Sequence, residues 1–238
     1  MKKLISFLVV SAVCASFASC GDSKKNNSDT SNKNGTSVSD GDTSYADDEE
    51  IVYEDKVFPN DGDAYLAIVD KKWSLEYWGR DEDALAFSAG TVPITGNGDY
   101  SVSITTNTYG CREQASGGDP HADIKGEGLS FLAVMIKEGE TKYPDAVITV
   151  NSVKVDGKEV AMTSKPYTSS DDGKDTRANI FNTWVTTPAT DARSTEGPLY
   201  ESGNPTDFCK DYSALVVNEE DFASWTDIQV DFTVSGIN

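Results

Sequence analysis

Histidine and basic residues are scarce in this chain. One histidine, His121, stands among 238 residues, which leaves little room for histidine-based catalysis or for a metal centre built from several histidines. Lys and Arg total 20 against 40 Asp and Glu, and the net charge of −20 disfavours binding to nucleic acid or to anionic lipid. No Ser-His-Asp motif, P-loop or Rossmann fingerprint is found. Most enzyme classes are therefore disfavoured, and neutral or cationic partners remain.

Long apolar runs are also lacking, except at the N-terminus, where one predicts a bacterial lipoprotein signal. Lys2 and Lys3 supply a positively charged start, residues 4–17 form a mainly apolar region, and a small-residue cleavage site ends at Cys20. A cysteine at that place accepts diacylglycerol before cleavage, so we expect residues 1–19 to be removed and Cys20 to be lipidated. This predicts a membrane-anchored, outward-facing protein. An ordinary secretory peptide is the alternative, and a transmembrane helix is disfavoured because it needs about 20 apolar residues.

The segment after Cys20 has almost no apolar side chains. Between residues 21 and 50 only Val38, Tyr45 and Ala46 are apolar. Such a stretch cannot bury enough surface to offset its ordering entropy. We therefore expect a disordered linker over residues 20–50 and one folded domain over residues 51–238.

Cysteine is rare, and its distribution predicts at most one disulfide. Cys14 leaves with the signal and Cys20 is lipidated, so Cys111 and Cys209 are the thiols that remain. Two thiols in an oxidising compartment favour a Cys111–Cys209 disulfide. Two separately buried thiols are the alternative.

The dominant hydrophobic period of the domain is two, which is typical of β-strands with one wet face. Residues 100–105 and 228–234 alternate apolar and polar side chains, and Asp156-Gly157 predicts a hairpin between 146–155 and 158–160. Further strands are expected at 65–69, 85–87, 131–136, 178–184 and 214–217. Only residues 219–225 look helical, with Asn218 as cap and Phe222 and Trp225 packed in the core. The prediction is an all-β, jelly-roll-like antiparallel β-sandwich with one short helix near the C-terminus.

Several segments occur in an order that resembles a known family. They are residues 65–70, the Trp73-x-x-x-Tyr77-Trp78 motif, and residues 94–104, 153–158, 177–184 and 228–237. Together they resemble β-sandwich modules attached to secreted glycoside hydrolases and lipoproteins of gut and rumen Firmicutes. The resemblance covers about residues 63–237 and implies carbohydrate binding without catalysis.

The first candidate binding segment is rich in aromatic rings. Trp73, Tyr77 and Trp78 lie close together among polar residues. Sugar rings have apolar C–H faces, so flat aromatic side chains suit them as stacking surfaces. The alternative is that two of these three rings belong to the core, since buried Trp is common in sandwiches.

The second candidate segment combines planar polar groups with an aromatic ring. In a regular strand Arg177 and Asn179 share one face with Phe181, while Asn182 and Trp184 share the other. A guanidinium fork and amide groups can bind paired hydroxyls. We therefore include Arg177, Asn179, Asn182 and Trp184 among the expected ligand-binding residues. The alternative is an ordinary exposed sheet face without a ligand, which would have the same residue pattern.

Carboxylates cluster in two turns. Asp171, Asp172 and Asp175 surround one turn, and Asp61 and Asp63 surround another, which leaves structural calcium as an open alternative. The spacing is not that of an EF-hand, and acidic loops without metal are commoner. The prediction is therefore a domain without metal or other cofactor.

These observations predict a lipid-anchored cell-surface module that binds a polysaccharide or oligosaccharide and is not an enzyme. An adhesion or scaffold domain that binds another envelope protein is the first alternative. A glycosidase with two catalytic carboxylates is the second, because sequence does not reveal the separation of carboxyl groups.

Overall fold

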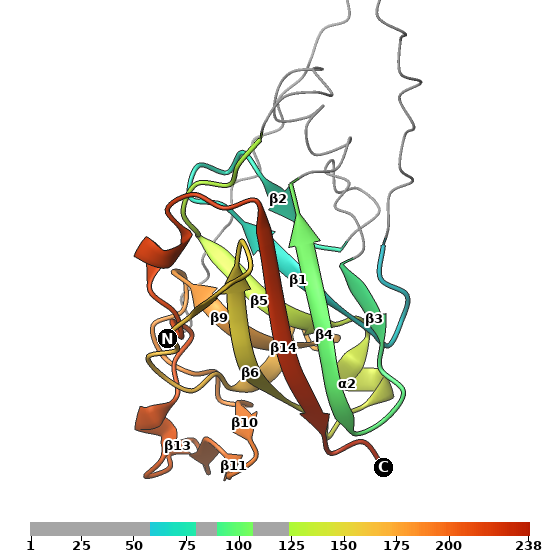
Figure 1. The fold of residues 1–238 in the computed structure, drawn as a ribbon. Coiled ribbons are helices and arrows are strands. Elements are labelled where there is room, and N and C mark those ends of the chain that lie inside the picture. Colours follow the sequence, from blue (N-terminus) through green and yellow to red (C-terminus); the bar gives the residue numbers. More distant parts are fainter. Residues whose placement is uncertain (1–57, 80–89, 107–123) are drawn as a thin grey trace, which may run out of the picture. The chain divides into compact units, whose positions relative to one another are not determined.

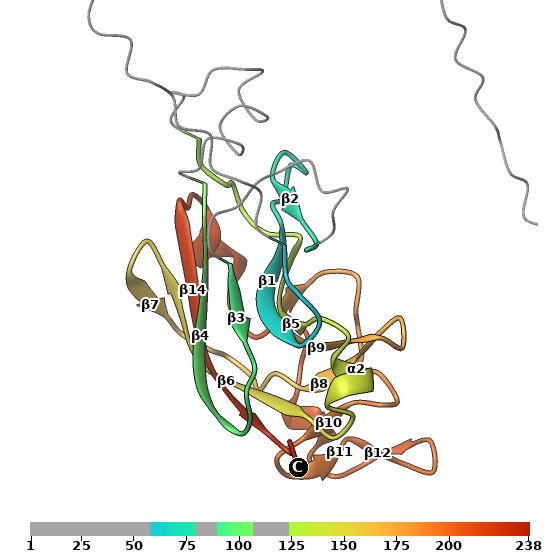
Figure 2. The ribbon, with the colours of Figure 1, turned by 90° about the vertical axis from the view of Figure 1, so that its right-hand side faces the viewer.

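Two antiparallel sheets packed face to face form the domain in the computed structural model, which describes residues 58–79, 90–106 and 124–238 (Figures 1 and 2). The larger sheet contains β1 (Asp63–Val69), β2 (Glu76–Tyr77), β3 (Thr91–Pro93), β5 (Phe131–Ile136), β8 (Thr168–Asp171), β9 (Asp175–Asn182), β10 (Arg193–Ser194) and β11 (Gly197–Pro198). Its order is β11-β10-β8-β9-β5-β1-β2, with β3 also paired to β1. The predicted antiparallel β-sandwich is thereby confirmed.

The smaller sheet has four strands in the order β4-β14-β6-β7. They are β4 (Gly98–Thr105), β6 (Val147–Val155), β7 (Lys158–Val160) and β14 (Asp227–Ser235). A separate pair is formed by β12 (Tyr200–Glu201) and β13 (Asn204–Pro205). The predicted hairpin is confirmed, since Asp156 and Gly157 join β6 to β7 with φ of 49° and 77°. No helix in the described ranges is long and apolar enough to cross a membrane.

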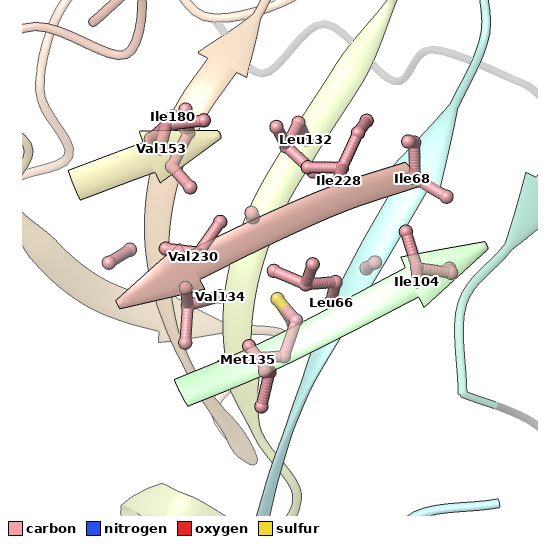
Figure 3. Close-up of a cluster of buried hydrophobic side chains, with 14 of the residues drawn as sticks. Leu66, Ile68, Ile104, Leu132, Val134, Met135, Val153, Ile180, Ile228 and Val230 are labelled. Carbon is pink, nitrogen blue, oxygen red and sulfur yellow. The ribbon is translucent and has the colours of Figure 1, made fainter. Parts of the chain in front are cut away.

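The core lies between the two sheets, as Figure 3 shows. Alternate residues of the smaller sheet supply it, whereas every residue of β1 and β5 is buried, as their continuous apolar runs indicate. Leu66 and Ile68 of β1 and Leu132 and Val134 of β5 come from the larger sheet, and they face Ile104, Val153, Ile228 and Val230 of the smaller sheet. A second, smaller cluster of buried residues contains Tyr167, Ala192, Leu199, Cys209, Tyr212 and Ala214.

The outer face of the smaller sheet is polar, and side chains near its centre form hydrogen bonds with one another. The Asp231 carboxylate accepts hydrogen bonds from Lys154 Nζ at 2.8 Å, from Ser101 Oγ at 2.7 Å and from Ser152 Oγ at 2.8 Å. The hydrogen bond from Lys154 is the largest cause that holds the pKa of Asp231 well below its usual range. This face therefore has little unused hydrogen-bonding capacity at its centre.

The expected C-terminal helix was wrong in place and type. The one α-helix within the described residues is α2 (Gly139–Lys142). The segment near the C-terminus instead forms a 3-10 turn, η2 (Glu219–Phe222), and another such turn is η1 (Cys209–Asp211). Asn218 makes no side-chain cap, and Trp225 pairs with Gly126 through two backbone hydrogen bonds of 2.8 and 3.0 Å. This pairing holds the chain extended at Trp225, so the helix cannot continue that far.

Two other strand predictions need correction. Residues 214–217 form no strand; they make an isolated bridge between Phe181 and Leu215, and the Val216 carbonyl accepts a hydrogen bond from the Thr163 amide at 2.7 Å. The strand expected at 178–184 ends at Asn182, because the Asn182 side chain accepts a hydrogen bond from the Trp184 backbone and turns the chain.

Several predictions fall on parts of the chain outside the described residues. They are the signal, Cys20, the linker, the strand at 85–87, His121 and Cys111. Cys209 is buried, and it is bonded to no other cysteine within the described ranges. The Cys111–Cys209 disulfide stays a prediction.

Candidate functional site

Four aromatic rings meet at one end of the larger sheet and form what we call the aromatic cluster: Trp73, Trp78, Phe131 and Trp184. The ring centroids of Trp73 and Trp184 are 5.6 Å apart, and those of Trp78 and Trp184 are 6.3 Å apart. Phe131 lies beneath them, 5.0 Å from Trp78 and 5.7 Å from Trp184. Trp73 is 55% exposed and Trp184 51%, whereas Phe131 is only 2% exposed. The cluster therefore has a buried base and two tryptophans open to solvent.

Trp73 is held by a turn that a buried carboxylate organises. Asp70 directly follows β1 and is fully buried; its Oδ1 accepts hydrogen bonds from the Ser74 amide at 2.8 Å and the Leu75 amide at 3.1 Å. Its Oδ2 accepts one from Ser74 Oγ at 2.7 Å. Trp73 itself has φ of 58°, a left-handed conformation that is a genuine outlier for so bulky a side chain. The turn thus holds an exposed tryptophan in a backbone conformation that costs free energy.

Trp184 is held from the other side of the cluster. Its backbone amide donates to Asn182 Oδ1 at 3.0 Å, and its ring stacks on Phe131 with an interplanar angle of 13°. The preceding residue, Thr183, donates from its amide to the Ser130 carbonyl at 3.3 Å, next to Phe131. Asn182 is therefore a positioning residue for Trp184, since it is 2% exposed and does not reach the surface.

A β-bulge in β9 changes the faces predicted for the second segment. Leu132 of β5 pairs with Phe181 and Ala133 pairs with Asn179, which leaves Ile180 without a partner on β5. The alternation shifts by one residue there, and Asn182 comes to the face of Asn179, where its Nδ2 donates to Asn179 Oδ1 at 3.0 Å. The expectation that Asn182 lies opposite to Asn179 was therefore wrong.

The bulge brings polar groups onto one face without exposing them. Asn179 is fully buried, and the Arg177 guanidinium pairs with Asp171 at 2.7 Å with 18% of its side chain exposed. Within the described residues, Arg177 Nε, Asn179 Nδ2 and Ser169 Oγ lack hydrogen-bond partners. Tyr167 contacts Asn179, but no hydrogen bond of good geometry joins the Asn179 amide to it. In this conformation Arg177 and Asn179 do not line the surface beside the aromatic cluster.

Tyr77 belongs to the core rather than to an exposed surface. It is 1% exposed, and its ring meets that of Tyr65 edge to face at 6.4 Å. Trp78, its neighbour, lies partly buried in the aromatic cluster and donates from Nε1 to Glu76. Burial, followed by the nearby Asp175 carboxylate, raises the pKa of Tyr65.

The structure thus brings together Trp73, Trp78 and Trp184 from the predicted set, with Asn182 behind them. Sequence reasoning missed Phe131 and Asp70. Phe131 stands in a continuous apolar run whose members look alike, so no local signal distinguishes it. Asp70 could have been found, because an Asp at the end of an apolar strand and before polar residues commonly accepts hydrogen bonds from the backbone of a turn.

The acidic turns use their carboxylates for protein contacts. Asp171 binds Arg177, and Asp175 accepts from the Glu138 amide at 2.8 Å and from the Tyr65 hydroxyl at 3.2 Å. Asp63 accepts from the Asn60 amide at 2.9 Å. Among the residues that the structure describes, no three His, Cys, Asp or Glu side chains come together in a way that could hold a metal ion.

No family model, curated protein or solved structure matches this chain. The structure therefore defines the class of this domain: it is all-β and sandwich-like, with exposed tryptophans at one end of the larger sheet. The resemblance to carbohydrate-binding modules stays a prediction.

Proposed function

We propose that this domain is a non-catalytic carbohydrate-binding module whose ligand stacks on Trp73 and Trp184. The observation that carries the proposal is the pair itself: two tryptophans from separate turns, about half exposed, with ring centroids 5.6 Å apart. Trp78 lies beside them and provides additional apolar surface. Flat rings of this kind suit the apolar faces of sugar rings.

The backbone of Trp73 strengthens the proposal. A non-glycine residue with φ of 58° costs on the order of 1 to 3 kcal/mol when the surrounding structure must hold it there. Asp70 and its three hydrogen bonds supply that restraint. A ring needed only for packing would gain more by being buried, as Trp225 is. The strain is therefore associated with keeping a ring exposed, which is what a ligand-stacking surface needs.

Replacement of either exposed tryptophan should weaken glycan binding without unfolding the domain. Removal of one stacking ring costs about 1 to 3 kcal/mol of binding, by analogy with bases stacked on aromatic side chains. Trp73→Ala and Trp184→Ala should therefore bind about five- to 150-fold more weakly. Pull-down of the mature protein on insoluble polysaccharides, followed by titration with the oligosaccharides of the best binder, measures this change.

Leu215→Ala is the matched control, because Leu215 is 43% exposed and does not belong to the aromatic cluster. It should leave binding unchanged. If both tryptophan variants bind normally while they melt like the unchanged protein, the ligand is not held by this cluster.

Docking of another envelope protein is the second candidate, because exposed tryptophans are also enriched at the centres of protein interfaces. Ionic strength separates the two candidates. Stacking on a neutral glycan should barely respond to salt, whereas a chain of net charge −20 that docks on a basic protein should bind more weakly as salt rises.

We also propose that Cys20 carries a lipid that anchors the module outside the cell membrane. The proposal is supported by the apolar run and the cysteine at the cleavage site. Cys20→Ala should abolish lipid labelling and release the protein from the membrane fraction. Unchanged labelling would contradict this prediction.

A further inference from the structure

A cavity of about 430 Å³ opens beside the turn that carries Trp73. It is lined by Lys71, Lys72, Glu127, Gly128, Glu219, Glu220 and Ala223. Its volume lies within the range of small-molecule sites, about 300 to 1,000 Å³. Most of the lining residues carry a charge, but the aliphatic parts of their side chains supply much of the cavity surface.

One residue of the lining, Gly128, is a glycine with a fixed backbone. Gly128 has φ of 68°, and a Cβ atom placed there would lie 2.9 Å from Lys71 Cβ. Its amide donates to the Phe222 carbonyl at 2.8 Å, and its carbonyl accepts from Trp225 Nε1 at 3.2 Å. The backbone is therefore fixed on both sides, and no side chain occupies this part of the cavity.

The cavity and the aromatic cluster share the same two backbone segments. Lys71 and Lys72 immediately precede Trp73, while Gly128 precedes Phe131 by three residues, at most about 10 Å of chain. The Lys71 amide donates to the Glu127 carbonyl at 3.2 Å, which joins the two segments. Trp73 is not part of the lining, so a ligand needs more than one ring to contact both the Trp73 ring and the cavity.

The charges of the lining indicate which ligand fits. Lys71 pairs with Glu219, and Lys72 pairs with Glu127 at 2.5 Å; both pairs are exposed. Glu220 has no ion pair among the described residues. Hydroxyl groups both donate and accept, so alternating carboxylates and ammonium groups suit them. An anionic sugar would meet three carboxylates against two ammonium groups and would be repelled.

We infer that this cavity is a second subsite of the same binding site and that it takes the next ring of a neutral, hydroxyl-rich sugar chain. This inference depends on the proposed carbohydrate-binding function. The ligand is an oligosaccharide rather than a monosaccharide, and it is not a uronic acid polymer.

The test variant is Lys72→Ala/Glu220→Ala, which removes one donor and one acceptor and leaves the net charge unchanged. The matched control is Lys158→Ala/Glu159→Ala, because these exposed residues of β7 also carry one charge of each sign and lie outside the cavity lining. The probes are neutral gluco-, xylo- and manno-oligosaccharides of increasing length, from single sugars upward, and oligogalacturonides of the same lengths. Affinities are measured by calorimetry on the mature protein.

Affinity for one neutral series should rise with chain length in the unchanged protein. The cavity variant should bind the shortest ligand normally and the longest about 5- to 160-fold more weakly, as expected for the loss of two hydrogen bonds, one from the removed donor and one to the removed acceptor. Trp73→Ala should weaken binding at every length. The control should match the unchanged protein throughout.

Normal binding of long ligands by the cavity variant would overturn the second subsite, while loss of binding in Trp73→Ala would still support the proposed function. A preference for oligogalacturonides would overturn the neutral ligand class. If no series binds at all, the proposed function fails together with the subsite.

Discussion

Trp225→Ala should lower the free energy of unfolding by about 3 to 5 kcal/mol, the usual cost of removing a large buried aromatic ring. Trp225 is fully buried, and its Nε1 donates to the Gly128 carbonyl at 3.2 Å. Its backbone pairs with Gly126 in both directions. For a domain of this size, that loss corresponds to a fall in melting temperature of about 6 to 20 °C. Thermal unfolding of the mature protein measures it.

Two further variants keep this prediction testable if Trp225→Ala does not fold. Trp225→Phe should lose less stability, because it retains part of the ring. Gly126→Ala should also destabilise, because its Cβ would lie 2.0 Å from Trp225 Cε2. Trp184→Ala, which removes a half-exposed ring, serves as the comparison and should melt nearly normally. Equal melting of Trp225→Ala and Trp184→Ala would contradict the assignment of Trp225 to the core.

Asp70→Ala should weaken glycan binding and lower stability together. Its carboxylate accepts from the Ser74 amide, the Leu75 amide and Ser74 Oγ, so removal leaves two backbone donors without their acceptor. An unsatisfied buried donor costs about 1 to 3 kcal/mol, and only the Leu75 amide is buried whereas the Ser74 amide is partly buried. We therefore expect a loss of at least about 1 to 3 kcal/mol. The turn then no longer holds Trp73 at φ of 58°, and the folded protein should lose as much affinity as Trp73→Ala does.

Ser74→Ala is the control for Asp70, because it removes one hydrogen bond and keeps both backbone donors satisfied. Its loss of stability and affinity should be much smaller. Binding titrations well below the melting temperature of each variant separate affinity from unfolding. An Asp70→Ala protein that melts early but binds normally would show that the turn does not position Trp73 for the ligand.

The tryptophans of the aromatic cluster could be predicted from the sequence, but their meeting in space could not. Trp73, Trp78 and Trp184 were expected from their chemistry, because exposed-looking tryptophans among polar residues suit a sugar. Their meeting at one end of the sheet could not be derived, since Trp184 is far along the chain from Trp73 and Trp78. Tyr77, next to Trp78, fitted the prediction of a ligand-binding ring equally well. Only its packing against Tyr65 in the structure shows that it is buried.

The sequence by itself determined the class of fold, because a period of two is a local property of each strand. The alternation in β4 and β14, the apolar run of β5 and the Asp156-Gly157 turn all act over a few residues. The tertiary structure decided what depends on distant pairing: the bulge at Ile180, the extended chain at Trp225 and the place of Phe131 beneath Trp184. The bulge reverses the face of Asn182, and it arises from the register between β5 and β9, which no short stretch of either strand encodes.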